Sequence, residues 1–342
     1  MNPSFLSILG RISAGENLSR DEMTLAIDQI MSGSCEAEQI GLFLTALAAK
    51  GETPVEVAGA AAAMRAHMTP IQSQHPQLLD TCGTGGGGST TFNISTSAAL
   101  VIAAVGVPLA KHGNRSVTSK SGSADVLAAL GVNISANVAQ VEHCLDQLGI
   151  CFCFAPLMHP AMKHVAAVRK QLGIRTIFNL LGPLANPAHA THQLLGVGLP
   201  ELRPLVAAAL CELGIERALV VSGQDGLGEV TLAGSTQVTQ IENGELTHFE
   251  WQPSDFGLEV APLHTIQIST PDQSAEIIRN VLAGQPGPAR DIVVLNAAAG
   301  LIAARHCVSP TEAAGQAIEA IDSGRASERL RQLAVLSHQE VA

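Results

Sequence analysis

The residues with the most evident chemical potential lie between Asp80 and Thr96, where the sequence reads DTCGTGGGGSTTFNIST. Five glycines and seven hydroxyl side chains are crowded into this stretch. Glycines allow positive φ angles and a close approach to a bulky anion, so successive N–H groups can converge on phosphate oxygens while Ser and Thr add neutral donors. The stretch predicts a phosphate-binding segment that ends at the positive end of a helix. A flexible glycine loop is the alternative interpretation.

Neither common nucleotide-binding loop fits this segment. The sequence has no GxxxxGK[ST] there, and Gly83-x-Gly85-x-x-Gly88 matches GxGxxG only because a run of four glycines satisfies many patterns. The phosphate would therefore belong to a ligand of another kind.

A second polar cluster, KHGNRSVTSKSGS, runs from Lys111 to Ser123 and carries three cations and five hydroxyls. A charge run is usually a solvated face, but the whole chain has only 19 Lys and Arg, so their concentration here indicates an anionic ligand. Residues 98–110 between the two clusters predict a buried helix that leads into a buried strand, and they are too short to cross a bilayer. Both clusters are then expected at the carboxyl ends of parallel strands, where α/β sheets bind ligands.

A third cationic segment follows His159 and Pro160, which are expected to open a helix. Its Arg169 has a planar guanidinium that could pair with a carboxylate through two parallel hydrogen bonds, whereas an ordinary surface helix is the alternative. His159 and His164 are five residues apart and do not share a helical face, so we expect structural or channel-lining roles for them rather than metal binding.

Composition bounds the class of protein. The chain has 342 residues, 46% apolar and 14% charged, which predicts a compact protein with room for two domains. A net charge of −11 argues against a general binder of nucleic acid or of acidic membranes. Seven cysteines without a CxxC pair indicate reduced thiols rather than disulfides or a zinc site. Residues 1–10 lack the basic start of a signal peptide, so we expect a cytoplasmic protein without membrane association.

The predicted fold class is α/β, with a small all-helical domain and a larger α/β domain whose central, mostly parallel sheet is flanked by helices. Capping signals open helices at Ser19 (with Glu22), at Ser34 and at Thr53 (with Glu56). Short apolar strands, one of them at 292–295, alternate with helices from residue 76 onward, and Asn243-Gly244 predicts a hairpin. We expect the helical domain at 1–73 with a returning segment around 160–188, and the α/β domain at 74–159 and 189–342. Excess apolar residues on the first helices suggest a homodimer interface there.

These segments resemble the anthranilate phosphoribosyltransferase family of tryptophan biosynthesis. Its pattern GTGGDG-x-x-[ST]-F-N-[IV]-S-T is met by residues 83–96 with one exception, KHGNR-[SA]-V-[ST]-S-K-S-G-S-[AS]-D by 111–125, and VRKxLGxRTxFNLLGPLxNP by 168–187. The resemblance implies transfer of the phosphoribosyl group of phosphoribosyl pyrophosphate (PRPP) to the amine of anthranilate, with Mg²⁺ as cofactor.

The resemblance also implies site residues. Anthranilate would be held by Gly83, Asn114 and Arg169, and Mg²⁺ by Ser95 and Glu229. No acid or base is identified, and catalysis would be positioning by Lys111, Asn114 and Arg169. The residues implied for PRPP are Gly83, Gly86, Gly87, Thr91, Asn93, Ile94, Ser95, Thr96, Lys111, His112, Gly113, Asn114, Arg115, Ser116, Val117, Thr118, Ser119 and Ser123.

Two positions depart from the family pattern. Gly87 replaces the Asp of GTGGDG, and Gly228 replaces the first acid of the family's Asp-Glu magnesium pair. Both changes remove carboxylates near the metal, so we expect weaker Mg²⁺ affinity, with Asp225 as a displaced substitute ligand. One interpretation is an active enzyme with an altered response to Mg²⁺. The other is a weakly active or non-catalytic paralogue that binds phosphoribosyl or nucleotide ligands or nucleic acid.

Three other classes of protein fit this sequence less well. A pyrimidine nucleoside phosphorylase shares the fold class but is not expected to carry KHGNRS. A nucleic-acid-binding relative conflicts with the acidic balance. A regulatory or scaffold protein would leave Arg169 unexplained.

Overall fold

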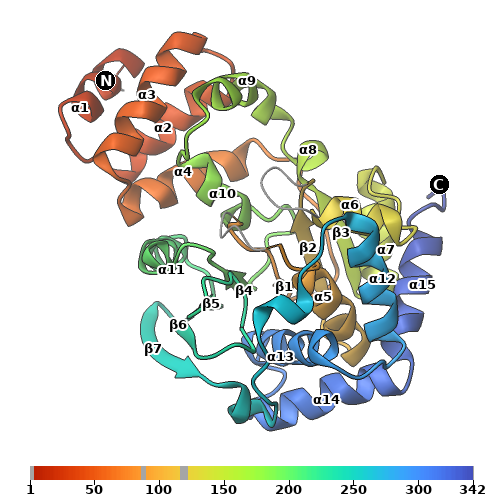
Figure 1. Ribbon diagram of the computed structural model, residues 1–342. Coiled ribbons are helices and arrows are strands. Elements are labelled where there is room, and N and C mark those ends of the chain that lie inside the picture. Colours follow the sequence, from red (N-terminus) through yellow and green to blue (C-terminus); the bar gives the residue numbers. More distant parts are fainter. Residues whose placement is uncertain (1–3, 86–89, 116–121, 342) are drawn as a thin grey trace.

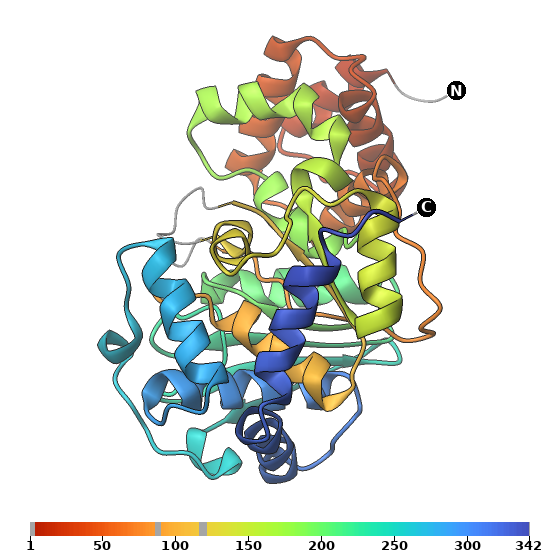
Figure 2. The same cartoon turned by 90° about the vertical axis from the view of Figure 1, so that its right-hand side faces the viewer.

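A computed structural model describes residues 4–85, 90–115 and 122–341. A group of helices from the N-terminal part of the chain lies at one end of the molecule, and a sheet with its own helices forms the larger remainder (Figure 1). The view turned by 90° shows the same division (Figure 2). Among these residues, no helix combines the length and the apolar character that a membrane span requires.

The helical end consists of α1 (Phe5–Ser13), α2 (Arg20–Met31), α3 (Ala37–Lys50) and α4 (Pro54–Ala66). Later in the chain, α9 (Lys163–Leu172) and α10 (Phe178–Leu184) return to lie against these helices (Figure 1). The predicted capping boxes at Ser19 and Thr53 are confirmed. The predicted start at Ser34 is wrong by two residues, because Glu36 takes the N-cap position and donates its backbone N–H to Gln39 Oε1 at 3.0 Å.

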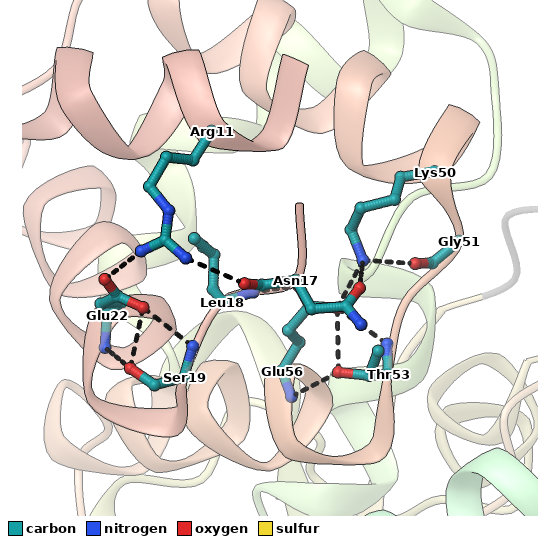
Figure 3. Close-up of polar contacts among 9 residues, drawn as sticks. All are labelled: Arg11, Asn17, Leu18, Ser19, Glu22, Lys50, Gly51, Thr53 and Glu56. Carbon is teal, nitrogen blue, oxygen red and sulfur yellow. Dashed lines mark hydrogen bonds and ion pairs between the residues drawn. The ribbon is translucent and has the colours of Figure 1, made fainter. Parts of the chain in front are cut away.

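Polar contacts fix the turns that join these helices (Figure 3). Glu56 is fully buried, and its carboxylate accepts hydrogen bonds from Leu18 N (2.9 Å), Lys50 Nζ (2.9 Å), Thr53 N (2.8 Å) and Thr53 Oγ1 (3.0 Å). The carboxylate thereby ties the first turn of α4 to the end of α3 and to the loop before α2. A buried charge with this many donors is stabilised rather than left uncompensated.

A seven-stranded sheet organises the larger part, in the order β3-β2-β1-β4-β5-β6-β7. The first five strands in this order are parallel to one another. β6 pairs with β5 in the antiparallel sense, and β7 pairs with β6 in the same way. Their bounds are β1 Leu79–Asp80, β2 Leu109–Gly113, β3 Ile150–Phe154, β4 His192–Gly196, β5 Arg217–Gly223, β6 Thr236–Glu242 and β7 Glu245–Trp251. The turn at Asn243 and Gly244, with φ of 52° and 80°, confirms the predicted hairpin.

Helices cover both faces of the sheet. Residues alternate between two cores: Leu194 and Leu219 face one, while Leu195 and Val220 face the other. The second core also contains α11 (Arg203–Glu212) and the N-terminal helices, so these helices are joined to the sheet by continuous apolar packing. The other helices are α5 Ile94–Val105, α6 Ser123–Ala129, α7 Val138–Leu148, α8 Ala155–Met158, α12 Pro271–Leu282, α13 Pro288–Ala303, α14 Pro310–Asp322 and α15 Arg325–Leu336, with 3-10 turns at Pro160–Met162, Pro200–Leu202, Pro253–Phe256 and Leu263–Ile266.

One predicted strand is wrong. Residues 292–295 lie inside α13, whose residues from Ile292 to Ala303 are all buried. A helix that is apolar on every side gives a continuous apolar run, which periodicity alone does not distinguish from a buried strand.

Candidate functional site

The two polar clusters meet at one edge of the sheet. β1 and β2 are adjacent and parallel, with Leu79 opposite Leu109, so the segments that follow both strands leave the sheet at the same edge. This arrangement confirms the expectation drawn from residues 98–110, which form α5 and the approach to β2. Open α/β sheets bind ligands at this edge.

Lys111 is the cation at the centre of this edge. It is only 3% exposed, and its Nζ donates to Thr81 O (3.1 Å), Thr81 Oγ1 (3.3 Å) and Ser95 Oγ (3.1 Å). Burial lowers the pKa of its ammonium. Lys111 therefore links the end of β1 to the first turn of α5 and supplies buried positive charge beside both.

Hydroxyl and amide groups surround the N-terminus of α5. Asn93 caps the helix, and Ile94, Ser95 and Thr96 form its first turn, where the Thr96 hydroxyl donates to Asn93 Oδ1. Thr91 pairs with Gln267, and Asn93 N donates to Ser274 Oγ at 2.9 Å, so later parts of the chain support this segment. Free N–H groups and the helix dipole at such a terminus favour an anion.

The glycine segment touches the end of β4. Thr84 N donates to Gly196 O at 2.9 Å, and a Cβ at Gly83 would lie only 2.8 Å from the same oxygen, so position 83 has no room for a side chain. Gly85 follows with φ of 65°. The expected PRPP residues Gly86, Gly87, Ser116, Val117, Thr118 and Ser119 lie outside the described residues.

The start of the second cluster is also close-packed. A Cβ at Gly113 would overlap Ser123 Oγ, and Ser123 Oγ donates to Asn114 O at 3.3 Å. Asn114 is exposed, and its Oδ1 accepts from Arg115 N at 2.7 Å. Arg115 pairs with Asp125 at 2.9 Å, which directs part of its charge to the protein itself.

Arg169 lies on α9, which packs against the helical end. Its guanidinium is 5.7 Å from the centre of the Phe178 ring, and Nη2 donates to Asn179 Oδ1 at 3.5 Å. The side chain is half-buried, and burial lowers its pKa. No described carboxylate forms an ion pair with it, so its charge is available to a ligand.

The two histidines at 159 and 164 are separated by the fold. The His159 ring lies against the His112 ring in a tilted arrangement, with centroids 5.0 Å apart, and burial lowers the pKa of His159 to about 4 and that of His112 to about 3. His112 Nδ1 lies 2.9 Å from Gly182 O. His164 instead contacts Gly33 of the helical end. The imidazoles of His112 and His159 are therefore neutral at pH 7. Among the described residues, no group of three or more His, Cys, Asp or Glu side chains could hold a metal.

Glu229 follows Gly228 in the loop after β5, close enough to Lys111 for the two charges to interact. It is half-buried, and burial raises its pKa to about 7 although the Lys111 charge opposes the shift. Throughout the described ranges, no donor hydrogen-bonds to its carboxylate, which leaves the oxygens available to a cation. Asp225 differs: its Oδ1 accepts from Leu227 N (3.1 Å) and its Oδ2 from Thr231 Oγ1 (2.8 Å), so its own loop occupies its carboxylate.

Sequence reasoning missed three residues that support the site. Asp80 is fully buried at the end of β1, accepts from His112 N at 3.3 Å, and has its pKa raised to about 6 by burial. Thr81 anchors Lys111, and Asn186 donates to Ala110 O at 2.8 Å. An acid placed where an apolar strand meets the glycine segment was a signal for Asp80; Asn186 is a fixed position of the third family pattern, but the pattern gave it no role.

Fold and site together define a glycosyl transferase of two parts. Residues 75–327 match the α/β domain of the glycosyl transferase family, and residues 6–68 match the helical bundle domain of that family.

The relatives narrow this class. A curated protein named anthranilate phosphoribosyltransferase from Rhodopirellula baltica is 49% identical over 331 residues, which is 97% of each chain. The crystal structure of anthranilate phosphoribosyltransferase from Thermus thermophilus is 40% identical with a TM-score of 0.92, covering 97% of this chain and 99% of that one. The Saccharomyces cerevisiae enzyme in complex with PRPP and Mg is 31% identical with a TM-score of 0.89, covering 97% of both chains. The chain belongs to the anthranilate phosphoribosyltransferase family.

Proposed function

We propose that this protein transfers the phosphoribosyl group of PRPP to the amine of anthranilate, giving N-(5-phosphoribosyl)anthranilate and pyrophosphate in tryptophan biosynthesis. The observation that carries the proposal is the presence of two cations suited to anionic groups: Lys111, which is buried beside the N-terminus of α5, and Arg169 on α9, which forms no ion pair with a described carboxylate. One substrate is a polyanion, and the other carries a carboxylate on an aromatic ring. The relatives named above agree with this choice.

The PRPP site would use the sheet edge and the N-terminus of α5. Backbone N–H groups at the start of α5 and the hydroxyls of Thr91, Ser95 and Thr96 would receive the pyrophosphate, and Lys111 would neutralise part of its charge. The departing pyrophosphate gains negative charge in the transition state. Fixed hydrogen-bond donors at this position would therefore stabilise the transition state more than the bound ground state. The remaining residues of this proposed cradle are Gly83, Gly86, Gly87, Asn93, Ile94, His112, Gly113, Asn114, Arg115, Ser116, Val117, Thr118, Ser119 and Ser123.

The acceptor site would lie between Arg169 and Asn114, with Gly83 at its base. The guanidinium would pair with the anthranilate carboxylate and present the amine to the anomeric carbon. That amine is neutral at pH 7 and is already nucleophilic. No strong base is therefore required from the protein, and positioning supplies the catalytic effect.

Glu229 and Ser95 fit one Mg²⁺ ion. The Glu229 carboxylate has no hydrogen-bond donor in the described part of the chain, and Ser95 contributes a hydroxyl oxygen at the start of α5, so the two residues would offer the hard oxygen ligands that Mg²⁺ prefers. A bound Mg²⁺ would act as Lewis acid for the leaving pyrophosphate. Glu229 and Ser95 are the only residues that we assign to the ion, because the family's acids at 87 and 228 are glycines in this chain. We therefore expect a weaker affinity for Mg²⁺ than the family pattern implies.

We further propose a cytoplasmic homodimer formed through the helical end. The large apolar side chains Leu6 and Leu42 are 63% and 55% exposed on α1 and α3, which are on this part of the molecule. We take residues 1–73 with 160–188 as one domain and 74–159 with 189–342 as the other. Light scattering of the protein and of Leu42→Glu would test the dimer, since the variant should be monomeric.

The test of the activity is the loss of anthranilate fluorescence with PRPP, measured across Mg²⁺ concentrations from none to a large excess. Turnover that requires Mg²⁺ would support the transferase. Absence of turnover at every concentration would favour the second candidate, a weakly active or non-catalytic paralogue that binds phosphoribosyl or nucleotide ligands, to which the glycines at 87 and 228 point.

A further inference from the structure

Three backbone segments meet at the end of β4 with no side chain between them. A Cβ at Gly196 would overlap the carbonyl oxygen of Gly228, and the oxygen of Gly196 itself accepts from Thr84 N at 2.9 Å. Gly196 therefore touches the glycine segment on one side and the loop that carries Glu229 on the other.

Position 228 is also crowded, although less than position 196, where the added Cβ would overlap the Gly228 oxygen. A Cβ at Gly228 would lie 2.9 Å from Gly198 N and 3.1 Å from Gly198 Cα. Neither Gly196 nor Gly228 has a positive φ, so their backbone conformations would accept any residue. The obstructing atoms are backbone atoms that no rotamer change removes, so in this chain a side chain at either position requires the backbone to shift.

The loop that carries Gly228 has little freedom to retreat. On one side, Gly223 N donates to Leu227 O at 2.8 Å. On the other, Asn296 of α13, which is buried, accepts from Val230 N at 2.9 Å and donates to Val230 O at 2.8 Å. A side chain at 228 would have to displace either this anchored loop or the end of β4.

We infer that Gly196 and Gly228 are positioning residues: their bare backbones hold the Glu229 loop against β4 and the glycine segment, and this contact fixes the Glu229 carboxylate toward the edge that holds Lys111 and Ser95. It follows that the glycine at 228 is not a vacant ligand position. An aspartate restored there would push the loop away and would weaken cation binding instead of adding a second carboxylate. This inference rests on the proposed function only for the role of Glu229.

The test compares Gly228→Asp, Gly228→Ala and Gly196→Ala with the wild type and with Gly315→Ala, a control glycine in α14 whose added Cβ meets nothing within 4 Å. Binding of Mn²⁺ alone is measured by electron paramagnetic resonance of the free ion, and unfolding by a thermal scan. We expect Gly228→Ala and Gly196→Ala to melt about 3 °C or more below the wild type. We expect Gly228→Asp to bind Mn²⁺ at least about tenfold more weakly despite its extra carboxylate.

Two results would overturn the inference. One is tighter Mn²⁺ binding, or a second bound ion, in Gly228→Asp. The other is a melting temperature for Gly228→Ala equal to that of Gly315→Ala. The thermal scan needs no ligand, so the backbone contact is tested even if the wild type shows no transferase activity; that failure would count against the proposed function alone.

Discussion

Two glutamates in different regions of the molecule are treated in opposite ways. Glu56, in the helical end, is fully buried and receives four hydrogen bonds, one of them from Lys50 (Figure 3). Glu229, at the sheet edge, is partly buried beside a loop of glycines and receives none from the described residues, and its pKa is raised to about 7. The first carboxylate holds helices together, whereas the second is the one that we propose binds a cation.

The same contrast extends to the neighbours of each glutamate. In the helical end, Arg11 pairs with Glu16 and Glu22, and Lys50 pairs with Glu56. At the sheet edge, the acceptors of Lys111 within the described residues are uncharged, and Asp80, His112 and His159 all have pKa values shifted toward their neutral forms by burial. Shifted groups gathered at the end of strands indicate a functional site, since a region built only for stability would pair them.

The largest expected effect is on the paired region. Glu56→Ala removes the carboxylate partner of Lys50, which keeps Asn17 Oδ1 and Gly51 O as acceptors, and takes the Glu56 acceptor from three further donors, so we expect unfolding free energy to fall by about 3–5 kcal/mol. Denaturant unfolding measures this. Glu38→Ala, a change of an exposed acid in α3, is the control and should alter stability by less than about 0.5 kcal/mol. Equal effects of the two changes would remove the basis of the comparison.

The next effect is a pH dependence that arises at the sheet edge. Burial lowers the folded pKa of His159 from 6.5 to about 4, so the folded state takes up the proton less readily than the unfolded chain. The stability that His159 contributes is present above pH 6.5 and is lost as the pH falls toward 4, by up to about 3 kcal/mol.

His159→Gln should therefore lose less stability than the wild type between pH 7.5 and pH 4.5. Denaturant unfolding at the two pH values measures the difference, with His338→Gln as a control because His338 is exposed. A wild type and a His159→Gln variant that lose the same amount would show that this imidazole does not resist protonation.

Replacing Glu229 should lower Mg²⁺-dependent turnover without lowering the free energy of unfolding. In Glu229→Gln the carboxylate lost has no hydrogen-bond donor to leave unpaired among the described residues, so we expect unfolding free energy at pH 8 to be unchanged or higher. Mg²⁺-dependent turnover should fall by about 10–100-fold. A destabilised Glu229→Gln with normal turnover would place Glu229 in the same class as Glu56.

The smallest effect concerns the acceptor. Arg169→Lys keeps the charge but loses the planar fork, so we expect the KM for anthranilate to rise by about tenfold while the KM for PRPP stays the same. Steady-state kinetics with each substrate varied in turn measures both constants. Arg175→Lys, a change at an exposed position near the end of α9, is the matched control. A shared rise in both KM values would show that Arg169 does not select the carboxylate substrate.

Much of the fold and of the site was predictable from sequence because the signals are local. Capping residues set the starts of α2 and α4, and the polar runs after β1 and β2 leave the sheet at the same edge, as their spacing predicted. The wrong assignments came from tertiary context: residues 292–295 are apolar because α13 is buried on all sides, and Asn186 reaches the strands only through folding. The contact of Gly196 with Gly228 joins positions that are distant in sequence. Neither glycine predicted this contact, because glycines also occur in ordinary turns.

The most direct test of the central claim is a crystal structure of the protein grown with Mn²⁺ and PRPP, with data collected at the manganese absorption edge. We expect an anomalous peak between Glu229 and the pyrophosphate, with Ser95 on its other side and Lys111 beside it. A peak at Asp225, or PRPP bound away from the N-terminus of α5, would contradict the assignment of the sheet edge as the phosphoribosyl transfer site.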